Sequence, residues 1–243
     1  MTGFRKIESI SDLENIKKSV LEKEKEASDR KLIHLCAGGG CLASGSLEVK
    51  KALLAEAEKA GIELEVKEVG CLGPCAKGPV IKVMPEGVYY ENMSPQDAKA
   101  VVEEHLKNKR IVESLVHRNI VGGKSAPYEK DIDFFKGQKK IVLRNCGNID
   151  PLNIREYIAA DGYRALANVL AKKDKDWVID QMKKSGLRGR GGAGFPTWLK
   201  WDLTRKAAGQ PKYMICNADE GDPGAFMDRS ILEGDPHAVL EAM

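Results

Sequence analysis

Four cysteines stand in two pairs: Cys36 and Cys41 with four residues between them, and Cys71 and Cys75 with three between them. The stretch between the pairs reads as a helix and then a strand, and a further strand precedes Cys36. Parallel strands that are joined by a helix end at the same edge of a sheet, so we expect the four sulfurs to converge. The neighbouring residues are small, which lets backbone N–H groups approach inorganic sulfide and stabilise a negative cluster. These neighbours are Ala37, Gly38, Gly39, Gly40, Gly73, Pro74 and Ala76.

Three chemistries suit four such thiols. Paired thiolates can hold a [2Fe–2S] cluster, and structural zinc sites also use four cysteine ligands. Two disulfides are a third alternative, which a reducing compartment disfavours. Zinc ribbons favour gaps of two residues, so the wider gaps here favour the cluster without excluding the other two.

The sequence around the second pair, Cys71-Leu72-Gly73-Pro74-Cys75-Ala76-Lys77-Gly78-Pro79, resembles the thioredoxin-like [2Fe–2S] ferredoxins. The resemblance implies that Cys36, Cys41, Cys71 and Cys75 bind the cluster. The gap between the pairs is somewhat shorter than in the complex I member, a difference that we place in the intervening helix and loop. The lone cysteines, Cys146 and Cys216, each stand at the end of a predicted strand; we expect them to be buried and assign them no ligand role.

The glycine-rich stretch 186–196 is a second candidate binding motif. Gly189, Gly191 and Gly194 satisfy the G-x-G-x-x-G spacing, but a helix rather than a strand precedes them, which argues against a dinucleotide fingerprint. A Walker loop is excluded because Phe195 and Pro196 stand where lysine and serine are needed.

This stretch carries Arg188 and Arg190 and leads into a helix that is expected to begin at Pro196, with Lys200 one turn further on. Free backbone amides and the helix dipole favour an anion such as a cofactor phosphate. A purely structural turn is the alternative.

An acidic stretch, Asn217-Ala218-Asp219-Glu220-Gly221-Asp222-Pro223-Gly224, follows a predicted strand at 212–216. Ligands often bind at the carboxyl end of a strand in open α/β sheets, and carboxylates there can accept hydrogen bonds from ribityl or ribose hydroxyls. A metal-binding loop or a solvated turn is the alternative.

Together, the glycine-rich and acidic stretches closely resemble the flavoprotein (51 kDa-type) subunit of respiratory complex I and its relatives in NAD-linked hydrogenases and formate dehydrogenases. The resemblance implies FMN binding by Gly189, Arg190, Gly191, Gly192, Lys200, Asn217, Asp219, Glu220 and Gly221. Phe195 matches an aromatic residue that stacks on the nicotinamide ring of NAD(H), and Asp222 stands where complex I has a glutamate near NADH. Leu203 replaces a second stacking aromatic residue, so the choice between NAD and NADP is left open.

The fusion of both units, together with residues 146–151, resembles the β subunit of electron-bifurcating or NAD-reducing hydrogenases. The resemblance implies hydride transfer from NADH to FMN and one-electron steps to iron–sulfur clusters, with no side chain acting as a catalytic acid or base. It also implies partner subunits: a hydrogenase or formate dehydrogenase catalytic subunit and a small ferredoxin-like subunit. The resemblance covers about the first half, or less, of the family's length, so a [4Fe–4S] cluster is expected in a missing C-terminal part.

The expected fold class is α/β, a thioredoxin-like ferredoxin domain followed by the N-terminal part of an FMN-binding domain. We expect an N-terminal helix within 1–29 that begins at a capping box of Ser11 and Glu14 and runs to about Ala27. The ferredoxin domain is expected at 30–115, with strands at 31–35, 62–69, 79–84 and 88–90 and helices at 47–60 and 94–107. A linker (116–139) is expected before the truncated flavin domain (140–243), with strands at 140–143 and 212–216 and helices at 154–157, 162–172, 175–184, 196–207 and from Pro236.

Composition limits the function classes. The net charge of the 243 residues is +3 with both signs interspersed, which gives no electrostatic footprint for nucleic acid. No signal peptide and no apolar run long enough for a bilayer occur, so we expect a cytoplasmic protein without membrane insertion. The chain stops just as Val239 and Leu240 begin a helical pattern, which favours a chain cut within a longer domain. Two rivals remain: a non-catalytic ferredoxin-like shuttle or docking module, and a zinc-stabilised interaction domain.

Overall fold

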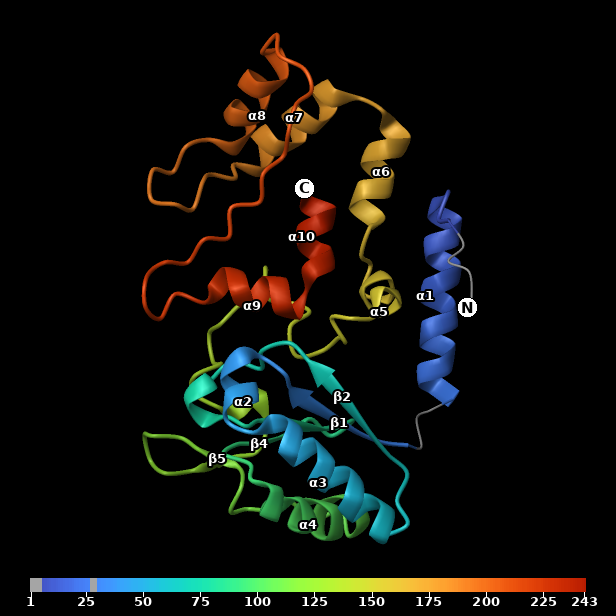
Figure 1. Cartoon of the computed structure of the whole chain (residues 1–243), viewed down its shortest axis with the longest axis vertical. Coiled ribbons are helices and arrows are strands. Elements are labelled where there is room, and N and C mark those ends of the chain that lie inside the picture. The colour runs from blue at the N-terminus through green and yellow to red at the C-terminus, as the bar shows by residue number, and fades with distance from the viewer. Residues whose placement is uncertain (1–5, 27–29) are drawn as a thin grey trace.

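The computed structural model describes residues 6–26 and 30–243. The molecule is elongated, with a small α/β unit at one end and a helical arm at the other (Figure 1). A long N-terminal helix runs beside the middle of the molecule.

The described α/β unit is built on one mixed sheet with the order β2-β1-β3-β4. The strands of this sheet are β1 (Lys31–Cys36), β2 (Leu64–Val69), β3 (Ile81–Met84) and β4 (Val88–Tyr90). β1 and β2 are parallel, and β3 is antiparallel to both of its neighbours, β1 and β4. All four predicted strands are confirmed.

Helices between the strands and after them pack with the sheet around the main core. They are α2 (Gly39–Ala43), α3 (Ser46–Lys59), the 3₁₀ turn η2 (Pro95–Asp97), α4 (Ala98–Ala100) and the π-helical continuation η3 (Val101–Lys107). Ile33 of β1, Leu53 of α3 and Val101 of η3 are fully buried in this core. Ser94 and Asp97 form a capping box before the last helical segment, whose predicted start is therefore confirmed.

The segment expected as a linker packs on β4. It contains β5 (His117–Arg118), β6 (Ser125–Ala126) and the 3₁₀ turn η4 (Glu129–Asp131). Ile132 and Phe135 are buried beside Tyr89, whose backbone N–H donates to the carbonyl of Pro127 at 2.7 Å. A few apolar side chains suffice to fix this glycine-containing segment to the sheet.

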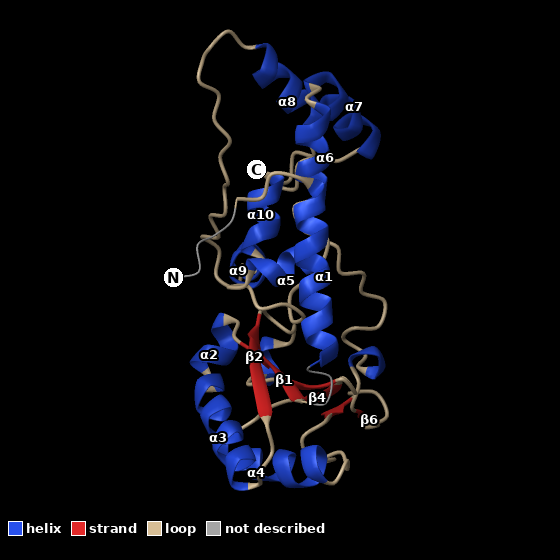
Figure 2. Cartoon of the chain, turned by 90° about the vertical axis from the view of Figure 1, so that its right-hand side faces the viewer, coloured by secondary structure: helices blue, strands red, loops and turns tan. Residues whose placement is uncertain are grey.

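The rest of the described chain consists of helices joined by loops, and Figure 2 shows no strand beyond the small unit. The helices are α5 (Ile154–Ala159), α6 (Arg164–Lys172), α7 (Lys175–Ser185), α8 (Thr197–Lys206), α9 (Met227–Gly234) and α10 (Pro236–Ala242). The predicted helices in this half are confirmed. α9 was not predicted.

The two strands predicted in this half are wrong. Residues 140–143 form turns, and residues 212–216 form an extended segment that pairs with no strand in the described part of the chain. Ile141 and Val142 are largely exposed, as are Tyr213 and Ile215. Their apolar pattern is typical of a strand, but a strand also needs a neighbour that satisfies its backbone hydrogen bonds.

α1 (Ile10–Glu26) packs against α5 and α6. The capping box lies two residues before its predicted place: Asp12 N–H donates to Ser9 Oγ at 3.2 Å, and Ser9 N–H donates to Asp12 Oδ2 at 3.0 Å. Ser11 and Glu14 therefore lie inside the helix, and the predicted end at Ala27 lies outside the described residues. No helix in the described ranges combines the length and apolar character that crossing a membrane requires.

Candidate functional site

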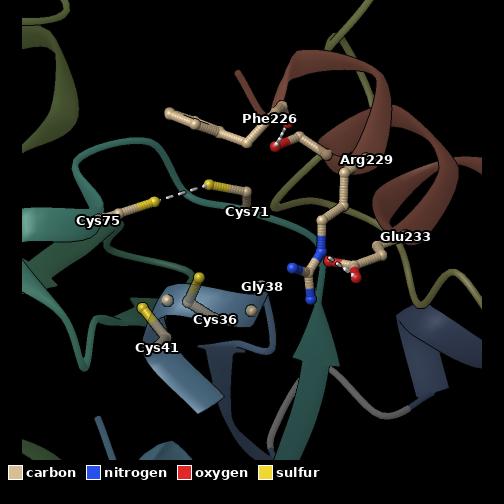
Figure 3. A pocket seen from close by; sticks show the side chains of 11 residues that line it. Cys36, Gly38, Cys41, Cys71, Cys75, Phe226, Arg229 and Glu233 are labelled. Carbon is tan, nitrogen blue, oxygen red and sulfur yellow. Dashed lines mark hydrogen bonds and ion pairs between the residues drawn. The ribbon is translucent and has the colours of Figure 1, made fainter. Parts of the chain in front are cut away.

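The four paired cysteines lie at one edge of the sheet. Cys36 ends β1, Cys41 lies in α2, Cys71 follows the end of β2, and Cys75 begins the 3₁₀ turn η1 (Cys75–Lys77). All four line one cavity of about 190 Å³ (Figure 3). The convergence expected from parallel β1 and β2 is therefore confirmed, while cluster ligation itself stays a prediction.

The thiols contact one another across this cavity. The Sγ atoms of Cys71 and Cys75 are 3.8 Å apart. A hydrogen bond with Cys41 raises the pKa of Cys36 to about 11, and the same bond lowers the pKa of Cys41. A hydrogen bond with Cys36 raises the pKa of Cys71, and burial raises that of Cys75. A cysteine binds a metal as its thiolate, so binding of a metal or cluster at this site releases protons.

Glycines keep the cavity open. A Cβ atom on Gly78 would lie 2.8 Å from Cys41 Sγ, and one on Gly40 would lie 3.2 Å from Cys75 Cβ. A Cβ atom on Gly38 would lie 3.3 Å from Cys71 Cβ. Larger residues at these positions would push the thiols apart.

The chemistry of the donor set is compatible with a dinuclear cluster, because it consists of four thiols that line one cavity. In a [2Fe–2S] cluster each iron takes two thiolates, and inorganic sulfides bridge the irons. Two thiol pairs that face one cavity therefore suit the cluster.

The opposite wall of the cavity comes from α9 and the residue before it. Phe226, Arg229, Ser230 and Glu233 line this wall, and Figure 3 shows Arg229 reaching toward the segment between Cys36 and Cys41. Sequence reasoning missed these residues. A signal was present in the i,i+4 pair of Arg229 and Glu233, but nothing local indicates what that pair faces.

Polar contacts join the sheet to the second half of the chain. The imidazole Nδ1 of His34 lies 3.1 Å from the carbonyl oxygen of Gly147. Burial lowers the pKa of His34 to about 4, although the bond to Gly147 opposes this, so the ring is neutral at pH 7 and its Nδ1 donates. Lys67 of β2 forms a 3.0 Å ion pair with Glu156 of α5, and both side chains are largely buried.

The predicted flavin residues of the first stretch lie on an exposed loop between α7 and α8, except for Lys200, which lies in the first turn of α8. Two hydrogen bonds close the loop. Gly189 N–H donates to the Phe195 carbonyl at 2.8 Å, and Arg188 Nη1 donates to the Gly194 carbonyl at 2.7 Å. Gly192 and Gly194 have positive φ. The remaining predicted contacts, Arg190, Gly191, Gly192 and Lys200, are solvent-exposed, as is Leu203.

The acidic stretch is extended and its glutamate has a structural partner. The Glu220 carboxylate accepts hydrogen bonds from the backbone N–H groups of Asp228 and Arg229 at 2.8 and 3.1 Å, at the start of α9. Burial alone would raise the pKa of Glu220, but these amides and that of Met227 bring it below its usual value. Asn217 Oδ1 accepts from Asp219 N–H at 3.1 Å.

The structure does not bring the two stretches together. Within residues 6–26 and 30–243, no hydrogen bond or ion pair joins the glycine-rich loop to Asn217, Asp219, Glu220, Gly221 or Asp222. Figure 1 shows the α7–α8 loop and the extended segment before α9 as separate excursions of the chain.

The lone cysteines differ from each other. Cys146 is buried, as expected, with its Sγ 3.8 Å from the Ser230 carbonyl oxygen. Cys216 is exposed, which corrects the expectation of a buried residue, because the strand predicted before it does not form.

Two families match this chain. Residues 23–106 match the family described as thioredoxin-like [2Fe-2S] ferredoxin, and residues 182–243 match the Nuo51 FMN-binding domain. The first match contains all four paired cysteines, and the second contains both predicted flavin stretches.

Two curated relatives and one solved structure are similar to parts of this chain. The NADP-reducing hydrogenase subunit HndC of Solidesulfovibrio fructosivorans is 58% identical over 44% of this chain and 22% of its own length. The F 2 subunit of the NADH-quinone oxidoreductase of Rhizobium meliloti (strain 1021) is 50% identical over 42% of this chain and 24% of its own. The thioredoxin-like [2Fe-2S] ferredoxin from Aquifex aeolicus, solved at 1.5 Å, is 30% identical, with a TM-score of 0.33 over 35% of this chain and 94% of its own.

The chain thus spans less than a quarter of these two curated relatives. Residues 23–106 are thus similar to the thioredoxin-like [2Fe–2S] ferredoxins, and residues 182–243 are similar to the Nuo51 FMN-binding domain.

Proposed function

We propose that this protein is an electron-transfer subunit of a multisubunit oxidoreductase, which passes electrons between a nicotinamide cofactor, FMN and iron–sulfur clusters. The observation that carries the proposal is the thiol cavity, whose two walls come from the two matched families. A cluster held there lies against the flavin-family segment of the same chain.

Cys36, Cys41, Cys71 and Cys75 are the proposed cluster ligands. Their support is the shared cavity and the three glycines that leave room for the sulfurs. We propose the domain division 30–115 and 140–243, with 116–139 packed on β4 between them.

FMN is proposed to bind the two exposed stretches around Gly189 and Asn217. The loop offers open amides, the charge of Arg190, and Phe195 as a stacking surface for nicotinamide, and α8 adds the charge of Lys200. FMN supplies the conversion of a two-electron hydride into one-electron steps, and the protein residues bind and orient it. Asp222 is the proposed neighbour of the dinucleotide.

These 243 residues are expected to hold FMN weakly, because the two stretches do not meet. Quenching of FMN fluorescence on addition of the chain measures the affinity. We expect half-saturation only at high micromolar concentration or above, and the same weak binding for Arg190→Gln. Purification of the chain with one tightly bound FMN would contradict this expectation.

Exposed apolar side chains support the proposal that this chain assembles with partner subunits. Tyr213, Met214 and Ile215 are exposed in succession, which is unusual for a surface without a partner. We propose assembly with a hydrogenase or formate dehydrogenase catalytic subunit and a small ferredoxin-like subunit, and a [4Fe–4S] cluster outside these residues. The reduced thiols favour the cytoplasm. The names of the two curated relatives differ between NADP and NADH, so both dinucleotides belong in the assay.

The visible absorption spectrum of chain purified without oxygen tests the proposal. A [2Fe–2S] cluster gives a red-brown protein that dithionite bleaches. A colourless protein containing zinc would overturn the proposal in favour of a zinc-stabilised interaction domain.

A second candidate is a ferredoxin-like shuttle or docking module without flavin chemistry. It is favoured by the separation of the two flavin stretches in the described residues. NADH-driven reduction of the cluster in the assembled oxidoreductase distinguishes the two functions: the first candidate requires it, and the second predicts none.

A further inference from the structure

The helix α9 closes the thiol cavity from the side of the flavin-family segment. Phe226, Arg229, Ser230 and Glu233 face the four cysteines, although they follow Cys75 by more than a hundred residues in the sequence (Figure 3). This contact joins the two matched families at the place where a cluster would be held.

Both ends of α9 are fixed in place. At its C-terminal end, a Cβ atom on Gly70 would lie 2.5 Å from the Cα of Gly234, so the backbones touch. The buried Asn145 side chain donates to the Asp235 carboxylate at 2.7 Å just beyond. At its N-terminal end the Glu220 carboxylate binds the backbone amides.

These contacts direct one arginine at the turn between Cys36 and Cys41. The Nε of Arg229 donates to Glu233 Oε1 at 2.7 Å. Its Nη2 lies only 2.7 Å from where a Cβ atom of Gly39 would be. Of the described residues that line the cavity, Arg229 alone carries a positive charge, and a guanidinium stays protonated at any ordinary pH.

We propose that Arg229 sets the reduction potential of the cluster in this cavity, an inference that rests on the proposed function. Reduction adds one electron to a cluster that is already anionic, so a fixed cation beside it favours the reduced form. Glu233 partly cancels that charge. The side chain of Arg229 is 63% exposed, so solvent screening keeps the effect moderate.

The test is a redox titration, followed by electron paramagnetic resonance, of the full chain with its cluster. Arg229→Gln is expected to lower the equilibrium constant for one-electron reduction of the cluster threefold to tenfold. This corresponds to a reduction potential that is lower by about 30 to 60 mV. Glu233→Gln removes the opposing charge and is expected to shift the potential upward. Arg164→Gln is the matched control, because Arg164 pairs with Glu14 of α1 and does not line the cavity.

Iron content is measured first, because it tests the proposed function separately from the role of Arg229. Absence of iron from the wild-type chain would defeat the proposed function. Wild-type iron with an unchanged potential in Arg229→Gln, or an equal shift in Arg164→Gln, would overturn the role of Arg229. If Arg229→Gln loses its cluster, the direction of the Glu233→Gln shift decides: upward supports the proposal, and no shift or a downward shift rejects it.

Discussion

At the scale of single residues, the cavity combines four thiols at the edge of the sheet with one arginine from α9. The cysteine pairs follow parallel neighbouring strands, so local pattern and sheet topology together place them in one cavity. Arg229 reaches the same cavity through α9, and no short-range pattern links it to Cys36. The capping box shows a subtler failure, because Ser9 with Asp12 and Ser11 with Glu14 both fit the spacing.

The contrast between a paired cysteine in the cavity and an unpaired one outside it gives a prediction at the scale of residues. Cys75→Ala is expected to remove most of the bound iron, since one iron loses a thiolate ligand and alanine offers no atom to replace it. Cys216→Ala is the control, because Cys216 is exposed and belongs to no thiol pair. Iron analysis after anaerobic purification measures both. Equal iron in the two variants would show that Cys75 is not a ligand.

At the scale of elements, helices were predicted well and isolated strands were not. Capping residues and apolar spacing define a helix locally, as at Ser94 and Pro95. A strand depends on a neighbour, and residues 212–216 have none among the described residues. The same limit applies to α9, whose start depends on the distant carboxylate of Glu220.

The close packing of the C-terminal end of α9 gives a prediction at the scale of elements. In Gly234→Val the new Cβ atom would lie 2.8 Å from Cys146 Sγ and 3.3 Å from the Cα of Gly70, which follows β2, so we expect the end of the helix to move away from both. We expect several-fold faster loss of cluster absorbance to an iron chelator. Gly209→Val is the control, since no atom lies within 4 Å of its Cβ position. Equal rates for both variants would mean that α9 does not cover the cluster.

At the scale of the whole molecule, the two halves are joined by polar contacts that composition alone cannot reveal. Lys67 and Glu156 are 14% exposed each and pair across the boundary between β2 and α5. Residues 116–139 resembled a linker because of their glycines and charges, yet Ile132 and Phe135 are buried. Which apolar residues in such a segment find a core depends on the folded sheet.

Breaking this pair tests the junction. Lys67→Met leaves the Glu156 carboxylate largely buried without its cation, and we expect a loss of roughly 2–3 kcal/mol, below the cost for a fully buried pair. Lys18→Met removes a mostly exposed pair with Glu22 and is expected to cost about 0.5 kcal/mol or less. Urea denaturation of the two variants compares them. Equal losses would mean that the Lys67–Glu156 pair contributes no more to stability than an exposed ion pair does.

The most direct measurement is the iron and acid-labile sulfide content of the chain purified without oxygen. The account predicts two irons and two sulfides per chain, both lost when the paired cysteines are replaced. Zinc in place of iron, or iron without sulfide, would contradict it.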